Sequence, residues 1–486
     1  MSGRTTSKSS RSPDAWFRAR FPGAFTRMSD AQVFAKAGEK GRRSDGFVSQ
    51  YTVARCLGPE GRPDAPLRYC PDDNTLYEYV PGEGIYETRT TKQVQHLVNN
   101  ILRECALQVP RKYRTSVRSV SSSGSFGKVV TALQGLHNFP HPGPTRDLRY
   151  LHVRNGVVDL KHLRLISFTP ELPSTWKLPV PWVPNPPEPH RFNEMVDRLF
   201  PLPEDRDLAL DVFASAFLGN PFQRLVVLGG AGGTGKSTIL SVLEELLGDG
   251  AYGSLRLENA RCRFTAAEWA GKLLLHESEA EQEYLDRALG VLKALSGQDR
   301  LEIERKGVQA RQTFRPRALP VLTTNHRLGI SPSGDYDAWK RRLIFFDVPK
   351  PEARIDLRPH FRDEMLREEG AGILFLFLTR AHRLRGAHSL RPLTNAQEKR
   401  VDAFLGSADP LAEWVATMVI RERGQSITRP EAIESATRWL QRRGYRNLPK
   451  SPDLWCSRLK AVMGDAGFRL SNSLRPKGWR SARLLG

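Results

Sequence analysis

The residues Gly230-Ala231-Gly232-Gly233-Thr234-Gly235-Lys236-Ser237 follow the apolar run 225–228 and open a helical pattern over 237–247. They form a complete GxxxxGK(S/T) loop in the order that this motif requires: a buried strand, a glycine-rich turn and a helix whose N-terminus faces an anion. The glycines let backbone N–H groups converge on phosphate oxygens. Lys236 is placed to reach the β- and γ-phosphates, and the Ser237 hydroxyl is placed for Mg²⁺. We therefore predict that the loop, extended to Thr238, binds a nucleoside triphosphate with Mg²⁺.

Two acids end the next apolar segment after this loop. Glu277 and Glu279 follow the run 272–275. An ATPase needs an acid at the end of a neighbouring strand to hold Mg²⁺ through water and to orient the attacking water. In an extended chain both carboxylates would point to the same side, so the sequence does not decide between them. Glu277 also joins Ser237 as a candidate Mg²⁺ ligand.

Three further polar residues lie at the ends of apolar runs. Asn325 follows the run 321–324, where its amide could bridge the γ-phosphate and the nucleophilic water. Arg341 and Arg342 come immediately before the run 343–346. A guanidinium is always charged and suits the stabilisation of transition-state charge across a subunit boundary. Each residue is a weak signal alone, but their order and spacing after the loop make a strong set.

An alternating stretch with a glycine in its middle, 301–311, lies between the acids and Asn325. The pattern predicts a hairpin. Its tip would carry basic residues, which are Arg305, Lys306 and Arg311.

This ordered set resembles the superfamily 3 helicases of viruses, phages and plasmids. Within them it resembles most the phage/plasmid primase-helicase family, to which the poxvirus primase-helicase is related. Residues 155–160 are similar to the family's Asn-Gly-hydrophobic-Asp segment, and residues 369–374 to its Glu-x-x-Gly-Ile-Leu helix. The resemblance covers residues 145–410 well and the flanks loosely. Thr234 stands where relatives often have Asn, and either side chain can form a hydrogen bond.

The resemblance implies an AAA+ type α/β ATPase that assembles as a ring, usually a homo-hexamer, around single-stranded DNA. In the family's terms, Walker A is formed by Gly230, Gly235, Lys236 and Ser237, Walker B is supplied by Glu277 or Glu279, and sensor 1 is Asn325. The arginine finger that acts on a neighbouring subunit would be Arg342 or Arg341. The hairpin with Arg305, Lys306 and Arg311 would line the pore, with Lys306 as the first choice for gripping the DNA backbone.

The remaining sequence divides the chain into six parts. Ser, Arg, Gly and Lys dominate the start, and the segment 179–189 is rich in proline and predicts an extended linker. Smaller expectations are a strand pair over 75–79 and 84–87, helices over 93–105, 191–199 and 205–218, and a serine-rich loop over 121–125. The parts are a flexible basic tail (1–45), an accessory α+β region (46–145), a helicase-associated segment (146–205), the ATPase (206–370), a helical connector (371–408) and a winged-helix-like domain (409–486).

The C-terminal part is strongly basic. Residues 411–486 contain 15 Lys and Arg against 6 Asp and Glu. Helical patterns over 411–421, 429–443 and 451–466 before a closing β-ribbon suggest a winged helix, whose third helix often enters a DNA groove. The phosphate contacts would be Arg458 and Lys460 on that helix and Lys477 and Arg480 on the wing. The alternative is a winged helix used only for protein packing.

The whole chain is basic as well. Its 486 residues include 74 Lys and Arg and 53 Asp and Glu, a net charge of +21. Such an excess indicates a polyanionic partner. Five scattered cysteines without a CxxC pair favour neither a zinc site nor disulfides. The longest apolar run, 373–378, is too short to span a bilayer, and no secretion signal is visible. We expect a location in the cytoplasm, in a bacterial host, and no membrane partner.

The leading hypothesis is an ATP-dependent replicative helicase of a mobile element, acting on single-stranded and forked DNA. No primase site is recognisable in the first 145 residues, so primers would come from a separate primase or other replication proteins. A second hypothesis is an initiator or loader in which ATP controls assembly at an origin without sustained unwinding. A third is an NTPase that remodels a protein partner. DNA-stimulated ATPase activity separates the third from the others, and strand displacement separates the first two.

Overall fold

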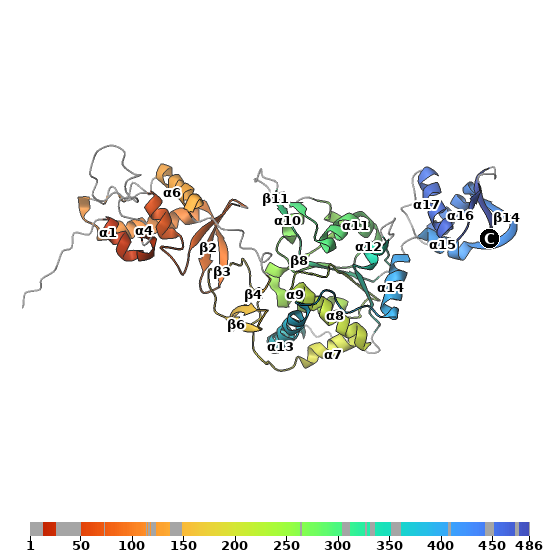
Figure 1. Ribbon diagram of the computed structural model, residues 1–486, viewed down its shortest axis with the longest axis horizontal. Helices are drawn as coiled ribbons and strands as arrows, with labels where there is room; N and C mark the ends of the chain where they lie inside the picture. Colours follow the sequence, from red (N-terminus) through yellow and green to blue (C-terminus); the bar gives the residue numbers. More distant parts are fainter. Residues whose placement is uncertain are drawn as a thin grey trace, which may run out of the picture.

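The computed structural model places most of the chain. It describes residues 13–25, 50–71, 73–112, 114, 117, 123–136, 148–262, 265–303, 312–325, 328–330, 336–350, 361–406, 410–442, 452–471 and 476–485. Figure 1 shows three parts along the molecule: N-terminal helices with a small sheet, a central α/β body, and a C-terminal domain of helices and strands. In the helices of these described segments, no stretch is long and apolar enough to cross a membrane.

The centre of the molecule is a parallel five-stranded sheet with the order β13-β7-β12-β9-β8. Its strands are short and almost wholly apolar, as expected for a parallel sheet that is buried on both faces. The expected fold class, α/β, is therefore confirmed in its coarse form. The strands are β7 (Leu225–Gly229), β8 (Tyr252–Ser254), β9 (Leu274–Glu277), β12 (Leu319–Thr324) and β13 (Leu343–Asp347).

Helices cover both faces of this sheet. Alternate residues of β7 point to different sides, so that Val226 and Leu228 belong to one hydrophobic core and Leu225 and Val227 to another. The first core contains α7 (His190–Leu199), α8 (Pro203–Ala216), α9 (Lys236–Ala251) and α13 (Phe361–Leu384). The second contains α10 (Thr265–Trp269), α11 (Gln282–Gly297), α12 (Tyr336–Lys340) and α14 (Asn395–Gly406).

The expected connector over 371–408 is part of this body. Helix α13 runs without a break across the expected boundary at residue 370 and packs against α8 and α9. Helix α14 packs on β13. The sequence pattern missed this because a domain boundary depends on which surfaces meet, and those contacts are long-range.

The N-terminal part is more ordered than expected. Its helices are α1 (Pro13–Arg20), the short η1 (Pro22–Phe25), α3 (Gln50–Leu57), α4 (Thr91–Gln108) and α6 (Ser123–Leu136), beside the antiparallel sheet β1 (Leu67–Cys70), β2 (Thr75–Val80) and β3 (Ile85–Arg89). The expected strand pair and helix over 93–105 are confirmed. Residues 13–25 are not a flexible tail, because Phe17 and Ala24 are fully buried in the local core. The serine-rich loop is also wrong in part, since α6 begins at Ser123.

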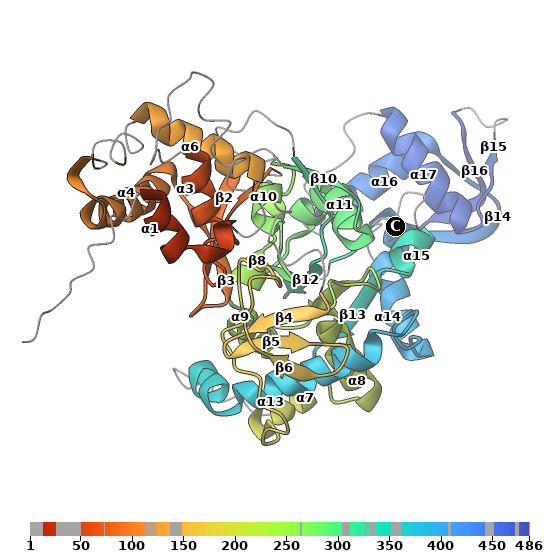
Figure 2. The ribbon, with the colours of Figure 1, turned by 60° about the vertical axis from the view of Figure 1, so that its left-hand side comes forward.

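A second small sheet joins the N-terminal part to the body. It consists of β4 (Tyr150–Val153), β5 (Gly156–Asp159) and β6 (Arg164–Ile166), and Figure 2 shows it beside α13. The proline-rich segment that follows is irregular but not a free linker. Val180 and Trp182 are buried in the main core, and the Asn155 amide bonds both backbone polar atoms of Trp182 at 2.9 Å.

The C-terminal domain has three helices and a three-stranded antiparallel sheet with the order β14-β16-β15. Its elements are α15 (Pro410–Met418), β14 (Val419–Thr428), α16 (Arg429–Arg442), α17 (Pro452–Asp465), β15 (Leu470–Ser471) and β16 (Gly478–Leu484). The expected first helix to residue 421 is too long. Its last residues instead begin β14, which pairs with β16, a partner far away in sequence. Trp455 is in the domain core, and Trp439 packs against it.

Candidate functional site

The glycine-rich loop joins β7 to α9 as the sequence predicted. Lys236 is the first residue of α9 and is 5% exposed. Its Nζ donates hydrogen bonds to the carbonyl oxygens of Gly230 (2.7 Å) and Ala231 (2.8 Å) and to the Thr234 hydroxyl (3.2 Å). Among the described residues it has no carboxylate partner, and burial lowers its pKa. A buried cation that is surrounded only by neutral oxygens provides an unbalanced positive charge inside the loop.

Two glycines of the loop are required by geometry. Gly230 has φ +143° and passes so close to β13 that an added Cβ would lie 2.3 Å from the Val348 carbonyl oxygen. Gly233 has φ +77°, and an added Cβ would meet no atom within 4 Å, so the space over the loop is open. The helix N-terminus at Gly235 has no side-chain cap. The first N–H groups of α9 therefore face this space, which suits an anion.

The register of the parallel sheet brings the candidate groups to one edge. Thr324 pairs with Gly229, and Leu322 pairs with Glu277. The loop after β7, the acids after β9 and Asn325 after β12 therefore all lie at the carboxyl ends of neighbouring strands. Ligands of open α/β sheets bind at this edge.

The two acids differ in their surroundings. Glu277 is half-buried, accepts a hydrogen bond from the Leu257 backbone N–H at 2.5 Å, and has a pKa that burial raises. Glu279 is exposed and accepts a hydrogen bond from the Asn325 amide at 3.5 Å. The expectation that both carboxylates share one side of an extended chain is wrong, because Glu279 has φ +55°. The left-handed turn separates the two side chains and points Glu279 towards Asn325.

The polar side chains at this edge of the sheet are suited to a Mg²⁺ ion that is bound mainly by phosphate oxygens. The described segments contain no group of three or more His, Cys, Asp or Glu arranged to hold a metal ion. Mg²⁺ is commonly bound by one or two protein oxygens together with substrate phosphates, so a complete protein cage is not needed. Ser237 is exposed at the start of α9, and Thr238 follows it. A hydroxyl and an acid at this edge are the donor set that such an ion uses.

The paired arginines lie at the opposite edge of the sheet. Leu343 pairs with Leu225, so Arg341 and Arg342 precede the amino end of β13, roughly 13 Å along β7 from its own loop at about 3.3 Å per residue. Arg342 is 7% exposed, and its Nη1 donates to the Ala338 carbonyl at 2.7 Å. Arg341 is exposed. Neither side chain can therefore act on the loop of its own subunit.

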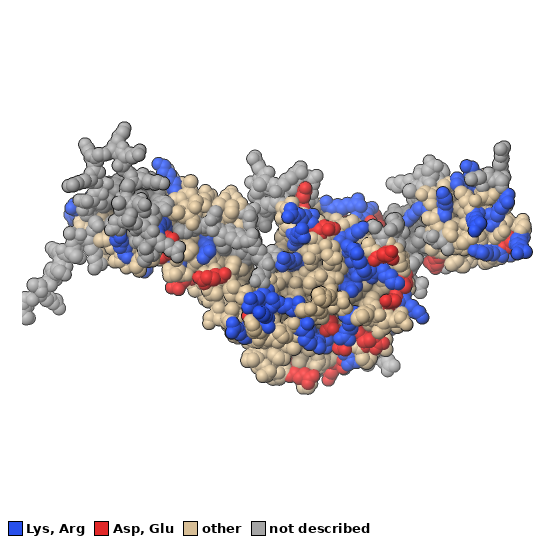
Figure 3. Space-filling model, in the orientation of Figure 1, with Lys and Arg blue, Asp and Glu red and all other residues tan. Residues whose placement is uncertain are grey.

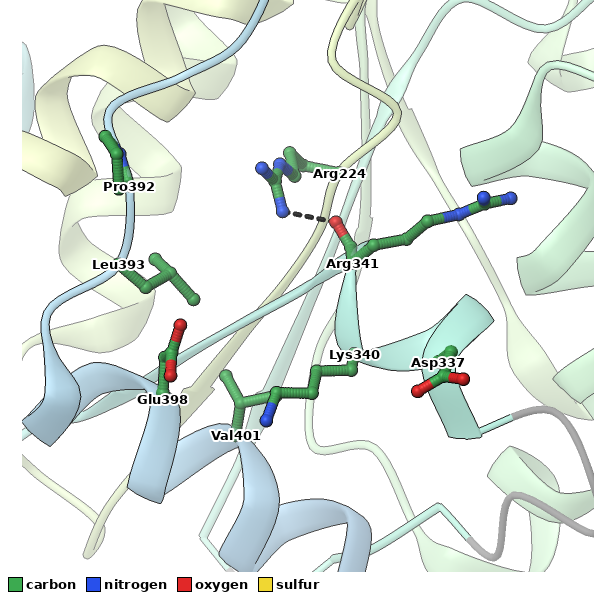
Figure 4. A pocket seen from close by; sticks show the side chains of 8 residues that line it. All are labelled: Arg224, Asp337, Lys340, Arg341, Pro392, Leu393, Glu398 and Val401. Atoms are coloured by element: carbon green, nitrogen blue, oxygen red, sulfur yellow. Dashed lines mark hydrogen bonds between the residues drawn. The ribbon is translucent and has the colours of Figure 1, made fainter.

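A pocket of 400 Å³ lies beside Arg341 (Figure 4). The Arg224 guanidinium donates a hydrogen bond to the Arg341 carbonyl oxygen, and the Arg341 side chain extends to the other side of the backbone, away from Arg224. Burial lowers the pKa of Arg224. The lining residues are Arg224, Asp337, Lys340, Arg341, Pro392, Leu393, Glu398 and Val401.

The two strands of the expected basic hairpin are present. β10 (Leu301–Ile303) pairs antiparallel with β11 (Gln312–Phe314). Its expected DNA-binding residues, Arg305, Lys306 and Arg311, lie outside the described residues. The pairing is confirmed, although the second strand lies beyond the expected stretch 301–311, and the role of the tip stays a prediction.

The basic residues expected to bind phosphate in the C-terminal domain are exposed. Arg458 and Lys460 lie on α17, Lys477 precedes β16, and Arg480 lies within it. Figure 3 shows mostly Lys and Arg side chains among the charged groups on the visible face of this domain. Nothing in the geometry brings these residues to the edge of the sheet that carries Lys236.

The structure adds functional candidates that the sequence analysis did not include. Thr323 and His276 lie beside the acid turn, and Arg224 bonds the backbone of Arg341. Glu369 caps α7, because its two carboxylate oxygens accept from the backbone N–H groups of Arg191 (2.9 Å) and Phe192 (3.0 Å). His276, next to the acids in the sequence, had a local signal, and Glu369 is the first residue of the Glu-x-x-Gly-Ile-Leu segment.

Comparisons with known proteins match two separate segments. Residues 58–201 match the family described as D5 N terminal like, which spans the expected accessory region and helicase-associated segment together. Residues 228–342 match a family of unknown function (DUF5906) and include both the loop and the paired arginines. No curated protein gave a match. The D5 match fits a replication protein of the phage primase-helicase kind.

Solved structures are similar at low identity. The A form apo structure of the NrS-1 C terminal region is 10% identical, with a TM-score of 0.49, and covers 90% of this chain and 100% of that chain. A second apo structure of the NrS-1 C terminal region (305-718) is 10% identical, with a TM-score of 0.48, and covers 87% of this chain and 97% of that one.

Proposed function

We propose that this protein is an ATP-hydrolysing DNA helicase that acts in the replication of a phage, a plasmid or an integrated mobile element. The observation that carries the proposal is the division of the candidate polar and charged groups between the two edges of the sheet. Lys236, Glu279 and Asn325 lie at one edge, and Arg341 lies exposed at the other. A site divided in this way is complete only when two subunits meet.

In this proposal the loop from Gly230 to Ser237 holds the triphosphate of ATP. The open space over Gly233, the uncapped start of α9 and the buried Lys236 ammonium support it. Ser237 and one of the acids would hold Mg²⁺, and a bound Mg²⁺ ion supplies charge neutralisation at the phosphates. Glu279 and Asn325 are placed together to orient the attacking water. The Glu277 carboxylate already accepts a hydrogen bond from the Leu257 backbone N–H, so we propose Glu279 for that role.

The position of Arg341 supports assembly into a ring. Since this exposed guanidinium cannot reach its own loop, we propose that it stabilises transition-state charge on the ATP of a neighbouring subunit. Of the two candidates, Arg341 is preferred here because the Arg342 side chain is buried. A closed heterologous interface generates a ring, and a hexamer is the family's usual form. The β10–β11 hairpin would then face single-stranded DNA with Lys306 at its tip.

The charge of the chain supports a nucleic-acid partner. The net charge of +21 and the basic C-terminal domain fit phosphate contacts. The three helices and three antiparallel strands of that domain support a winged helix, and we propose Arg458, Lys460, Lys477 and Arg480 as contacts to forked DNA. Primers would be supplied by a separate primase, and the protein would act in the cytoplasm of a bacterial host.

The test measures ATP hydrolysis with and without single-stranded DNA, together with strand displacement on a forked substrate. We expect DNA to stimulate hydrolysis and Lys236→Ala to abolish both activities while DNA binding persists. Full unwinding by Lys236→Ala would refute the proposal. Lys306→Ala should lose unwinding and keep basal hydrolysis. Normal unwinding by that variant would remove the pore-hairpin assignment and leave the ATP site intact.

A second candidate function is an ATP-regulated initiator or loader. It is favoured by the separate basic C-terminal domain, which could hold duplex DNA at an origin without translocation. Such a protein would bind and hydrolyse ATP and assemble on duplex DNA, but it would displace no strand from a fork. Electron microscopy with ATP and single-stranded DNA separates the two, because only the helicase should form rings threaded on the single strand.

A further inference from the structure

A hydrogen-bonded chain of three side chains crosses the sheet beside the acids. Tyr252 on β8, His276 on β9 and Thr323 on β12 take part in it. The Tyr252 hydroxyl lies 2.9 Å from His276 Nδ1, and His276 Nε2 lies 3.3 Å from the Thr323 hydroxyl. Thr323 is 3% exposed. The chain therefore links three neighbouring strands through one buried and two partly buried polar groups.

The Thr323 hydroxyl is the end of this chain that meets the acid turn. It donates a hydrogen bond to the Glu277 carbonyl oxygen and accepts one from the Glu279 N–H, each at 3.3 Å. The Thr323 carbonyl accepts from the Ala280 N–H at 2.8 Å. One residue of β12 thus contacts the backbone on both sides of Ser278, and no other strand makes such contacts to this turn in the described segments.

All hydrogen atoms of the chain can be assigned without conflict. Tyr252 donates to Nδ1 of a neutral imidazole, the Nε2–H group donates to Thr323, and Thr323 donates in turn to the Glu277 carbonyl. The Thr323 oxygen has two lone pairs and can accept from both His276 and Glu279. Burial lowers the pKa of His276 to about 4, so the neutral ring is the form present near pH 7.

The turn needs such support. Glu279 has φ +55°, a left-handed conformation that a glutamate adopts only when its surroundings hold it there. This conformation turns its carboxylate towards Asn325 at 3.5 Å. If the backbone returned to an extended form, the carboxylate would leave Asn325. Small misplacements of a reacting group can cost about 100-fold in rate.

We propose that Thr323, held by His276 and Tyr252, is the positioning residue that sets the direction of Glu279 for ATP hydrolysis. The proposal rests on the proposed function, since it assigns the support of the same acid. It predicts that loss of the Thr323 hydroxyl lowers the rate of hydrolysis without weakening the binding of ATP.

The experiment compares Thr323→Val, which keeps the shape and loses the hydroxyl, with Thr323→Ser, which keeps the hydroxyl. We expect Thr323→Val to lower kcat for DNA-stimulated hydrolysis about 10- to 100-fold with KM changed less than about twofold. Thr323→Ser should retain most of the rate. Tyr252→Phe, at the far end of the hydrogen-bonded chain of side chains, should lower kcat a few-fold. The matched control is Ser215→Ala, which removes a buried hydroxyl that bonds only the Val212 carbonyl in its own helix.

Hydrogen exchange followed by mass spectrometry provides a second readout that does not depend on activity. Peptides that contain Glu279 and Ala280 should exchange faster in Thr323→Val than in the wild type or in Thr323→Ser. Unchanged exchange in Thr323→Val, or equal losses of kcat in the Val and Ser variants, would overturn the positioning role. If the wild type hydrolysed no ATP, the proposed function would fail, while the exchange result would still decide whether Thr323 holds the turn.

Discussion

The guanidinium of Arg224 donates a hydrogen bond to the backbone carbonyl oxygen of Arg341. This contact joins the residue before β7 to the turn before β13, at the edge of the sheet opposite the glycine-rich loop. The loop and the arginine turn are therefore connected through one strand, β7, which begins beside Arg224 and ends at Gly229. A shift of this strand would therefore move both the glycine-rich loop and the arginine turn.

The two neighbouring arginines should behave differently when replaced. We expect Arg341→Ala to lower DNA-stimulated kcat by about 10³-fold and to leave ATP binding and the free energy of unfolding unchanged, because its side chain is exposed. Arg342→Ala should instead lower the free energy of unfolding by about 1–3 kcal/mol, since it removes a buried hydrogen-bonding group. Steady-state kinetics and urea unfolding measure the two effects.

Mixing experiments test whether Arg341 acts between subunits. Subunits with Arg341→Ala and subunits with Lys236→Ala should each have little activity, but a mixed ring would contain interfaces with an intact loop on one side and an intact arginine on the other. We expect the mixture to regain part of the activity. No recovery at any ratio would argue against action across the interface.

Arg224 should act through Arg341. Arg224→Ala frees the backbone of the arginine turn, and we expect a loss of about tenfold in kcat with ATP affinity retained. In a double-mutant cycle, Arg224→Ala should lower kcat little further in a protein that already carries Arg341→Ala, because both changes disable the same arginine turn. Additive losses would show that Arg224 has a separate role.

Much of the central body could be predicted from local patterns. The strand before the loop, the helix after it, the acid-tipped strand and the β10–β11 hairpin follow from short apolar runs and alternation. What could not be predicted depends on contacts between distant residues. The left-handed turn at Glu279 is held by Thr323 on another strand, and no sequence pattern near Glu279 indicates this turn.

The same reason explains the errors at the two ends of the chain. The segment 13–25 lies in a stretch, 1–45, whose overall composition predicts a flexible tail, yet Phe17 is fully buried against a core made by residues that follow much later. Val419 and Ile420 continue an apolar helical pattern, yet they pair with residues 483–484 of β16. Tertiary pairing outweighs local preference in such β-branched residues.

Glu369 is expected to contribute to stability. Its carboxylate binds the second and third N–H groups of α7, which has no cap of its own. We expect Glu369→Ala to lower the free energy of unfolding by about 1–2 kcal/mol in urea titrations. The neighbouring Glu368→Ala, which loses exposed ion pairs with Arg191 and Arg367, is the control and should cost less than about 0.5 kcal/mol. Equal effects would contradict the capping role.

Asp159 predicts a pH dependence of stability. Hydrogen bonds from the Arg149 guanidinium, together with His162 and the Lys161 backbone, hold the pKa of this buried carboxyl well below its usual range, against the opposing effect of burial. Because the folded pKa lies below the unfolded value of about 3.9, its contribution is complete above about pH 4 and is lost as the pH falls further. Asp159→Asn should lower the free energy of unfolding by about 2–3 kcal/mol at pH 7.

Urea unfolding of both proteins between pH 7 and pH 3 checks this prediction. The difference between wild type and Asp159→Asn should stay constant down to about pH 4 and shrink below it, because the carboxylate becomes protonated in the unfolded wild type while it stays ionised in the folded protein. A difference that did not change between pH 5 and pH 3 would mean that folding does not lower the pKa of Asp159.

The C-terminal domain should contribute electrostatic contacts to DNA. Arg458 and Lys460 are exposed on α17, and the double change to alanine should weaken binding to forked DNA and reduce the slope of log Kd against log salt by up to about 1.8, at about 0.9 for each duplex phosphate contact. Arg438→Ala on α16, a cation paired with Glu434, is the control and should leave the slope unchanged. Fluorescence anisotropy at several salt concentrations measures these slopes. If the double variant bound with wild-type affinity and slope, α17 would face protein rather than DNA.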